Sequence, residues 1–367
     1  MKPSCMAASL PSLQGIEMVM LAKNSRIEWI DVAKGGCIIL VVLWHTVIFS
    51  FAPSETNTPG YQAWFKLGMA LQPLRMPLFF MVSGFLAYSS VYSRTWRDTF
   101  QPRIATLLWL YVLWMTFNWG VHVILATYFN SAAVPKVNEL PMSMSTFLFD
   151  LVTANTTIWY LYALAIFFTV CKLFKNHSVK VVIILSILSI CSRLISDDWN
   201  IISLLSNAVF FAIGCFGRNL LVRHFAVFNP IRFAATIIVS TATLYVSWKY
   251  ELLSAPGIRF ALAITLIIAT MDTLAWVTHR LNLSAVAWIG QRSLPIYVIH
   301  MSIVVIFAQF TIPAVLEGAS LQAFTIVGPI LLTIANIVFC LFLYSILKRL
   351  RGVGLFSLPL RPNRTAA

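Results

Sequence analysis

The sequence predicts an all-α, polytopic membrane protein with about ten transmembrane helices. Of its 367 residues, 59% are hydrophobic and 10% are charged, whereas a soluble domain has about 25% charged residues. The apolar residues fall into separate runs of about 20, the length of helix that crosses about 30 Å of hydrocarbon. Basic residues lie in the short connections between these runs, as the positive-inside rule expects.

Ten apolar segments are expected to form the helices. Basic connections alternate with acidic ones along the chain, which predicts that both chain ends lie in the cytoplasm. Two outward connections are long, 52–71 and 129–156, and the amphipathic part of the second (Met142–Leu151) is expected to lie along the interface or to fold back as a lid. The expected helices cover approximately 30–51, 72–92, 104–128, 157–174, 179–195, 203–221, 231–248, 257–276, 288–311 and 324–347.

The chain is expected to have three parts. Residues 1–25 are predicted to be a disordered extension, because the run Met6–Leu13 is too short and too polar for the apolar core of a signal peptide. Residues 26–350 form the ten-helix membrane domain, and residues 351–367 form a cytoplasmic tail.

The composition argues against several classes of function. The net charge of +14 is spread over the connections and forms no basic stripe with exposed aromatic rings, so no nucleic-acid partner is expected. The six cysteines form no CxxC pair and the six histidines no HxxxH or HExxH pair, so no metal site is expected. No GxxxxGK[ST] phosphate-binding loop occurs, which argues against a nucleotide-driven pump.

The first apolar segment contains the most informative residues. It begins with charged residues and includes Asp31, Lys34 and His45. Lys34 and His45 are eleven residues apart, about three helical turns, so they share one face and are separated by roughly 16 Å along the axis. Ionisable groups within a membrane span are costly and by default mark a functional site. We therefore expect this helix to carry the chemistry.

Arginines at the ends of the next two segments have two possible roles. Arg75 lies near the start of the second segment, where it could hold an anionic group in a bidentate manner or extend to the lipid interface. Ser83 follows within that segment, beside a glycine that would let another helix approach closely. Arg94, Arg97 and Arg103 precede the third segment, where they could set the topology or bind the phosphates of a cofactor.

Later segments add aromatic and polar candidates. Trp159 and Tyr160 open the fourth segment, either as an interfacial aromatic belt or as rings that stack on a sugar. Asn207 contributes an amide to the sixth segment. Tyr297 and His300 lie in the ninth, and two membrane histidines together with Asp31 and Lys34 favour a reactive site over simple helix–helix hydrogen bonding.

Several short blocks resemble the acyltransferase-3 family of integral-membrane O-acyltransferases, and in particular its fucose 4-O-acetylase and WecH-like branch. They occur in the family's order between about residues 26 and 311, so that together they make the resemblance specific. The blocks are Asp31 with Lys34-Gly35 and His45, MPLFFMVSGF at 76–85, WYLYAL at 159–164, FFAIG at 210–214 and GQRSLPIYVIH at 290–300.

The resemblance implies ten core helices in a bacterial inner (plasma) membrane, acetyl-CoA as the acyl donor, and a hydroxyl of a cell-surface or lipid-linked glycan as the acceptor. Two positions depart from the pattern. Leu164 stands where other branches have a glutamate, so no acidic role transfers to it. Arg75 stands where relatives in this branch often have histidine.

Acyl transfer to an alcohol needs a base for the hydroxyl proton and a group that stabilises the oxyanion. We expect His45 to be the base, with an acetyl-His45 intermediate as an alternative route. Asp31 and Lys34 are expected to pair, and Lys34 is expected to hold the donor's phosphates with Arg97 or Arg103. Acceptor-side or oxyanion roles are expected for Arg75, Asn207, Tyr297 and His300, and further substrate contacts for Ser83, Trp159 and Tyr160.

A transporter or flippase of a small solute or lipid-linked sugar is the competing interpretation. Asp31, Lys34, His45 and Asp272 could then form a proton relay. The sequence shows no inverted repeat and no paired broken helices, which are typical of such transporters. The enzyme is therefore the favoured prediction.

Overall fold

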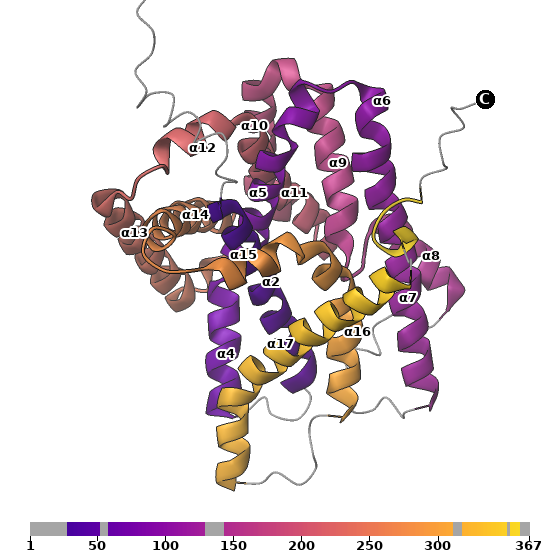
Figure 1. The fold of residues 1–367 in the computed structure, drawn as a ribbon. Coiled ribbons are helices and arrows are strands. Elements are labelled where there is room, and N and C mark those ends of the chain that lie inside the picture. Colours follow the sequence, from indigo (N-terminus) through magenta and orange to yellow (C-terminus); the bar gives the residue numbers. More distant parts are fainter. Residues whose placement is uncertain (1–27, 52–57, 129–142, 311–317, 351–352, 360–367) are drawn as a thin grey trace, which may run out of the picture.

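The computed structural model describes residues 28–51, 58–128, 143–310, 318–350 and 353–359. Every regular element in these ranges is a helix, which confirms the predicted all-α class (Figure 1). The predicted N-terminal extension and most of the predicted tail lie outside the described residues.

The helices follow the predicted apolar segments, with short α, 3₁₀ and π elements between them. One difference is α4, a helix within the stretch 52–71 that was predicted as a connection. The elements are α2 (Glu28–His45), η1 (Thr46–Phe51), α4 (Pro59–Ala70), α5 (Gln72–Tyr92), α6 (Trp96–Thr99), η2 (Phe100–Ala105), α7 (Thr106–Tyr128), α8 (Met144–Thr153), α9 (Trp159–Leu173), η5 (Lys175–His177), α10 (Ser178–Ile195), α11 (Trp199–Phe216), α12 (Arg218–His224), α13 (Pro230–Lys249), η6 (Leu252–Ser254), α14 (Ile258–Val277), α15 (Ser284–Gln291), α16 (Ser293–Phe310), α17 (Gly318–Arg349) and η7 (Val353–Leu355).

The number of full-length spans is smaller than the predicted ten. Within the described residues, eight helices are long and apolar enough to cross a membrane, and α15 with α16, which meet at an angle of 79°, make a ninth if the pair is one broken span. The remaining predicted segment is α9, whose 15 residues rise about 22 Å, short of the roughly 30 Å of hydrocarbon. Ala154 and Ile158, just before α9, are fully buried, so irregular chain enters the protein interior ahead of this helix.

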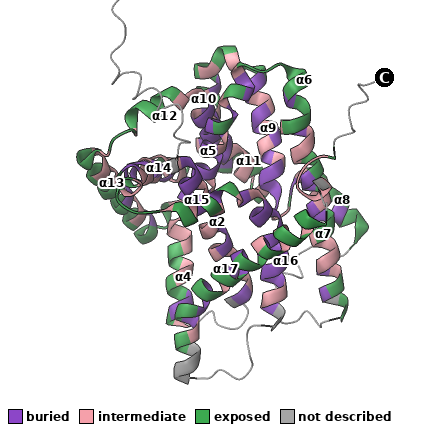
Figure 2. Cartoon of the chain, viewed as in Figure 1, coloured by how far each residue is buried: buried purple, intermediate pink, exposed green. Residues whose placement is uncertain are grey.

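The helices divide into a central group and a peripheral group (Figure 2). In α5, 72% of the apolar window is buried inside the protein, whereas in α13 the buried share is 11%. Large apolar side chains of α13, such as Ile238 at 67% exposure, therefore point away from the protein. Lipid tails are as apolar as these side chains, so this exposure suits a helix at the lipid boundary.

Glycines let the central helices approach closely at two places. A Cβ at Gly84 of α5 would collide with the carbonyl of Phe211 in α11, and a Cβ at Gly214 of α11 would collide with the carbonyl of Met81. These contacts confirm the close approach predicted beside Ser83. Similarly, Gly290 of α15 lies directly against the backbone of Asp31 in α2.

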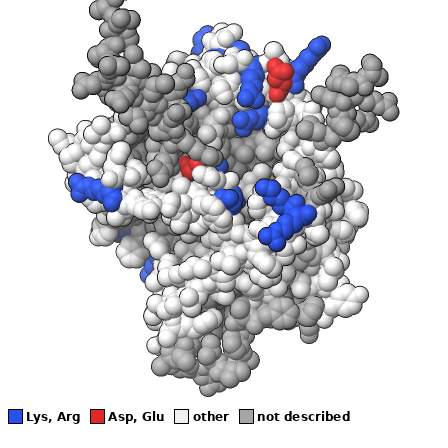
Figure 3. Space-filling model, in the orientation of Figure 1, with Lys and Arg blue, Asp and Glu red and all other residues white. Residues whose placement is uncertain are grey.

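The C-terminal ends of α5, α9 and α11 meet at one end of the bundle, here called the basic end. Lys172 near the end of α9 donates to the carbonyls of Ser90 and Arg94 at 2.8 Å each. Arg218, just after α11, stacks on Phe85 near the end of α5, 4.9 Å from its ring centroid. On the face shown in Figure 3, most lysines and arginines lie in the upper and middle parts of the molecule, and α17 itself ends with Lys348 and Arg349.

Part of the predicted C-terminal tail is bound to the bundle. The indole nitrogens of Trp109 and Trp114 in α7 donate to the carbonyls of Gly354 and Leu355, both at 2.8 Å. Phe356 also packs edge-on against Tyr344 of α17. Gly354, Leu355 and Phe356 therefore contact the helices of the bundle.

Candidate active site

Two histidines predicted from distant parts of the sequence form a hydrogen-bonded pair. Nδ1 of His45 at the end of α2 lies 3.0 Å from Nε2 of His300 in α16. Nδ1 of His300 lies 2.7 Å from the carbonyl oxygen of Tyr297. A carbonyl can only accept a hydrogen bond, so His300 carries its proton on Nδ1 and accepts from His45 through Nε2. His45 then donates through Nδ1 and keeps an unprotonated Nε2.

In this row of hydrogen-bonded groups, the nitrogen that remains free is on His45. Its Nε2 has no hydrogen-bond partner among the described residues. The ring lines a cavity of about 620 Å³, whereas His300 behind it is fully buried. A neutral imidazole held in one tautomer, with its basic nitrogen at a cavity wall, is the arrangement that general-base catalysis requires.

Breaks in the regular helices accompany both histidines. The α-helix of α2 ends at His45 and continues as the π-helix η1, an irregularity that is frequent at functional sites. The chain bends by 79° between α15 and α16. Pro295 lies in the first turn of α16, where its missing N–H leaves no helical bond unmade. Asn336 of α17 donates to the carbonyl of His300 at 3.1 Å, which anchors this turn of α16.

The cavity beside His45 lies at the end of the bundle opposite the basic end. Its wall includes the first residues of three helices, Gln72, Trp159 and Trp199, and polar residues of the segment before α9. Arg75 also lines it and is 6% exposed, so this side chain does not extend to the lipid interface. Arg75 stacks on Trp44 at 4.7 Å and donates to the carbonyl of Gly68 at 3.3 Å.

A second cavity of about 280 Å³ lies toward the basic end. Lys34 and Arg103 line it, as predicted for residues that hold one ligand, together with Ser83, Tyr160 and Tyr297. Arg103 belongs to the π-helix η2. Arg97 is exposed on α6 and is not part of this cavity wall. The predicted pair of phosphate-binding arginines is therefore divided between a cavity and the surface.

Tyr297 lines both cavities and forms the wall between them. Its hydroxyl donates to the carbonyl of Thr157 at 2.9 Å and accepts from the backbone N–H of Tyr160 at 3.3 Å. The hydroxyl of Tyr160 lies 2.6 Å from Oγ of Ser83. Ser83, Tyr160 and Tyr297 are thus linked by hydrogen bonds to one another and to Thr157 before α9, and they form a polar wall between the two cavities.

Asp31 lies outside both cavities. It is 9% exposed, and its carboxylate accepts from the side-chain amide of Gln291 at 3.1 Å, next to the glycine contact between α2 and α15. This places Asp31 at a helix–helix interface, while its predicted catalytic role stays a prediction.

Asp272 is also separate from the histidines. Its carboxylate is fully buried and receives both Nε (2.7 Å) and Nη2 of Arg232, and the backbone N–H of Asn229 at 3.2 Å. A carboxylate with these partners is a closed ion pair. It does not line the cavity beside His45, and the proton relay considered for a transporter stays a prediction.

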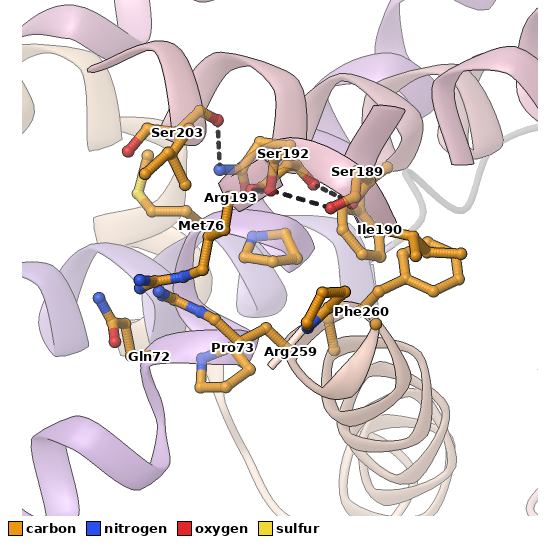
Figure 4. Close-up of a pocket in the computed structure, with 18 of the residues that line it drawn as sticks. Gln72, Pro73, Met76, Ser189, Ile190, Ser192, Arg193, Ser203, Arg259 and Phe260 are labelled. Carbon is orange, nitrogen blue, oxygen red and sulfur yellow. Dashed lines mark hydrogen bonds between the residues drawn. The ribbon is translucent and has the colours of Figure 1, made fainter. Parts of the chain in front are cut away.

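Asn207 and Trp159 line a third cavity of about 240 Å³ that also contains Arg193 and Arg259 (Figure 4). The sequence alone predicts no role in a site for these two arginines, because single basic residues at helix ends ordinarily mark membrane topology. Gln291, Asn336 and Trp44 were also missed. Gln291 and Asn336 carry amides within apolar segments, which is a signal that could have selected them.

Comparisons with known proteins agree with the residue blocks. The model of a family described as "Acyltransferase domain" matches residues 27–345, a range that contains every predicted site residue. Inner membrane protein YcfT of Escherichia coli (strain K12) is 25% identical over an alignment of 303 residues that covers 76% of this chain and 80% of that protein. No solved structure gives a significant match.

Proposed function

Because the chain belongs to the acyltransferase-3 family, we propose that this membrane acyltransferase moves an acetyl group from acetyl-CoA to a hydroxyl of a cell-surface or lipid-linked glycan. The observation that carries the proposal is the chain from the Tyr297 carbonyl through His300 to His45, which presents a basic nitrogen to a cavity. That cavity, about 620 Å³, is within the roughly 300–1,000 Å³ range of small-molecule sites.

We assign the donor to the cavity at the basic end. The positive-inside rule favours the cytoplasm for this end of the bundle, where acetyl-CoA is available. Lys34 and Arg103 at the cavity wall offer cationic donors for its phosphates. The acetyl thioester would reach His45 past Tyr297, the residue shared by the two cavities.

We assign the glycan acceptor to the cavity of His45. Trp159 and Trp199 at its wall pack edge to face with ring centroids 5.6 Å apart, and such rings offer apolar faces to a sugar. In this proposal the donor cavity lies toward the cytoplasmic side of the membrane and the acceptor cavity toward the opposite side, so the acetyl group crosses the bilayer. The fucose 4-O-acetylase and WecH-like branch stays a prediction.

The proposed reaction needs no group beyond the two substrates and the protein. Nε2 of His45 takes the proton of the acceptor hydroxyl, and the resulting oxygen attacks the thioester carbonyl. The new C–O bond forms, the C–S bond breaks, and the imidazolium of His45 returns its proton to the coenzyme A sulfur. The products are the O-acetyl ester and free coenzyme A. An acetyl-His45 intermediate remains the alternative route.

Arg75 is the best placed cation for the oxyanion of this reaction. It lines the same cavity as His45 and is close enough to act on it electrostatically. Its bond to Gly68 and its stacking on Trp44 hold the guanidinium in place. A buried, preorganised cation stabilises developing negative charge more than a mobile one.

Base-labile acetate released from the surface glycan of producing cells tests the proposal. Cells with the wild-type protein should release acetate, and cells with His45→Ala should lose acetate formation by about 10²–10⁴-fold, the usual contribution of a general base. His279→Ala is the matched control, since His279 is exposed beyond α14, and should behave as wild type.

The amount of folded protein in the membrane has to be equal in all three strains. Equal acetate from wild type and His45→Ala at equal abundance would rule out His45 as the base. Equal acetate with and without the protein would direct the test to longer acyl groups, and then to transport.

A further inference from the structure

The third cavity lies beside the proposed acceptor cavity. The two share Gln72, Met76, Trp159 and Trp199 in their walls. Its volume of about 240 Å³ is below the roughly 300–1,000 Å³ of typical small-molecule sites, so it suits one sugar-sized group. A ligand with two linked sugar units could therefore occupy both cavities at once.

Two arginines from different helices converge in this cavity. Arg193 comes from the last turn of α10 and Arg259 from the first turn of α14, and their guanidinium groups approach each other near Gln72 (Figure 4). They are close enough for Arg193 to repel Arg259, and Arg259 in turn acts on Arg75. Three positive charges thus lie near one another at the end of the bundle opposite the basic end.

No described residue neutralises this charge. Neither Arg193 nor Arg259 has a hydrogen-bond or ion-pair partner among the described residues, and the ion pair of the described residues that involves an arginine is that of Arg232. Asp197 also lines the cavity but pairs with neither guanidinium. Planar guanidinium groups bind carboxylates and phosphates in a bidentate manner, so the cavity is suited to an anion.

A buried acceptor atom in the same wall has no partner. Asn207 is 7% exposed, its Nδ2 donates to the carbonyl of Ser203 at 2.7 Å, and its Oδ1 has no hydrogen-bond partner. An unsatisfied buried acceptor costs about 1–3 kcal/mol. A ligand hydroxyl would satisfy it.

We infer that this cavity binds an anionic sugar of the acceptor, with Arg193 and Arg259 holding its carboxylate or phosphate and Asn207 Oδ1 accepting from one of its hydroxyls. The shared wall then directs the neighbouring sugar of the same glycan toward His45. The identity of the ligand as the acceptor rests on the proposed function, whereas binding of an anionic sugar can be measured without it.

Binding is tested on the full-length protein in nanodiscs of phosphatidylcholine, whose headgroups carry no net charge. The probes are D-glucuronate, inorganic phosphate and the neutral D-glucose, and the readout is the melting temperature as a function of probe concentration. Glucuronate or phosphate should stabilise wild type and His45→Ala, and glucose should not. The anion that stabilises more identifies the carboxylate or the phosphate as the preferred group.

Three variants test the assigned residues. Arg193→Gln combined with Arg259→Gln should weaken anion binding at least tenfold, and Asn207→Asp should weaken it by adding a negative charge. Arg223→Gln, which removes an exposed arginine of α12, should bind as wild type. If the double variant fails to fold, Arg193→Gln alone serves, since this side chain is exposed.

Equal stabilisation of wild type and the arginine variants, or equal stabilisation by glucose and glucuronate, would overturn the inference. The acetate assay separates it from the proposed function. Anion binding without any acyl transfer would support the cavity and refute the proposed function. Acyl transfer with no anion binding would support the proposed function and refute the inferred anion site.

Discussion

Among the described residues, the pair Arg232–Asp272 and the pair His45–His300 differ in what they leave exposed. Arg232 and Asp272 form a bidentate ion pair whose carboxylate also receives a backbone N–H, so both carboxylate oxygens of the fully buried Asp272 accept hydrogen bonds. His45 and His300 are also hydrogen bonded to each other. His45, however, keeps one ring nitrogen without a protein partner at a cavity wall.

This difference separates stabilising polar groups from reactive ones. Both pairs satisfy the rule that ionisable residues inside a membrane domain have partners. In the closed pair both carboxylate oxygens are occupied by protein donors, and the pair contributes to the fold. In the open pair, His300 orients His45 through a hydrogen bond, and one ring nitrogen of His45 remains available to a substrate. Burial alone would have classed Asp272 and His300 together, since both are fully buried.

Removing the second histidine should have the largest of the three effects that sharpen this comparison. His300→Phe removes the acceptor that orients His45. We expect kcat to fall about 10–100-fold, as it does when a hydrogen-bond partner that orients a metal-binding histidine is lost. His300→Gln can still accept through its amide oxygen and should recover part of kcat. The measurement is steady-state acyl transfer by purified protein.

A merely structural role of His300 predicts another pattern. The two variants would then differ in melting temperature and not in kcat per folded molecule. Equal kcat for His300→Phe and wild type would break the proposed chain from Tyr297 to His45.

Disrupting the ion pair between Arg232 and Asp272 should lower the stability of the protein and leave the rate of acyl transfer unchanged. Asp272→Asn removes the charge that Arg232 faces and should lower the free energy of unfolding by about 1–3 kcal/mol. Acyl transfer per folded molecule should stay at the wild-type level, because Asp272 does not line the cavity of His45. Thermal unfolding in nanodiscs and the acetate assay measure the two quantities.

Adding Arg232→Gln to Asp272→Asn is the matched control. It removes the unpaired cation and should recover part of the lost stability, since contacting residues are coupled. A large loss of kcat in Asp272→Asn at equal folded abundance would return Asp272 to the reaction and favour the relay of the transporter interpretation.

The smallest effect is expected from a change at Asn336, which donates to the backbone carbonyl of His300. Asn336→Leu keeps a similar size but removes the 3.1 Å hydrogen bond to the carbonyl of His300, so we expect a loss of about 1 kcal/mol in stability and a change in kcat smaller than that of His300→Phe. Unfolding and acyl transfer are again measured together. A kcat below that of His300→Phe would mean that Asn336 has a more direct role.

The sequence by itself determined the helices, the family and the two histidines. Apolar runs of helical length and the positions of the charges are local properties, so the expected segments reappear as helices with shifted ends. The predicted segment at α9 is a shorter helix than expected, because hydropathy does not show that the chain before Trp159 enters the core as irregular backbone.

Only the tertiary structure decided which polar residues work together. His45 and His300 are 255 residues apart in the chain, and the rotation and tilt that bring them into contact are set by packing against neighbouring helices. The same packing joined Lys34 to Arg103 in one cavity, left Arg97 on the surface, paired Asp272 with Arg232 and brought Arg193 to Arg259. A helical pattern specifies a face, but its partner across the bundle depends on contacts that no local pattern contains.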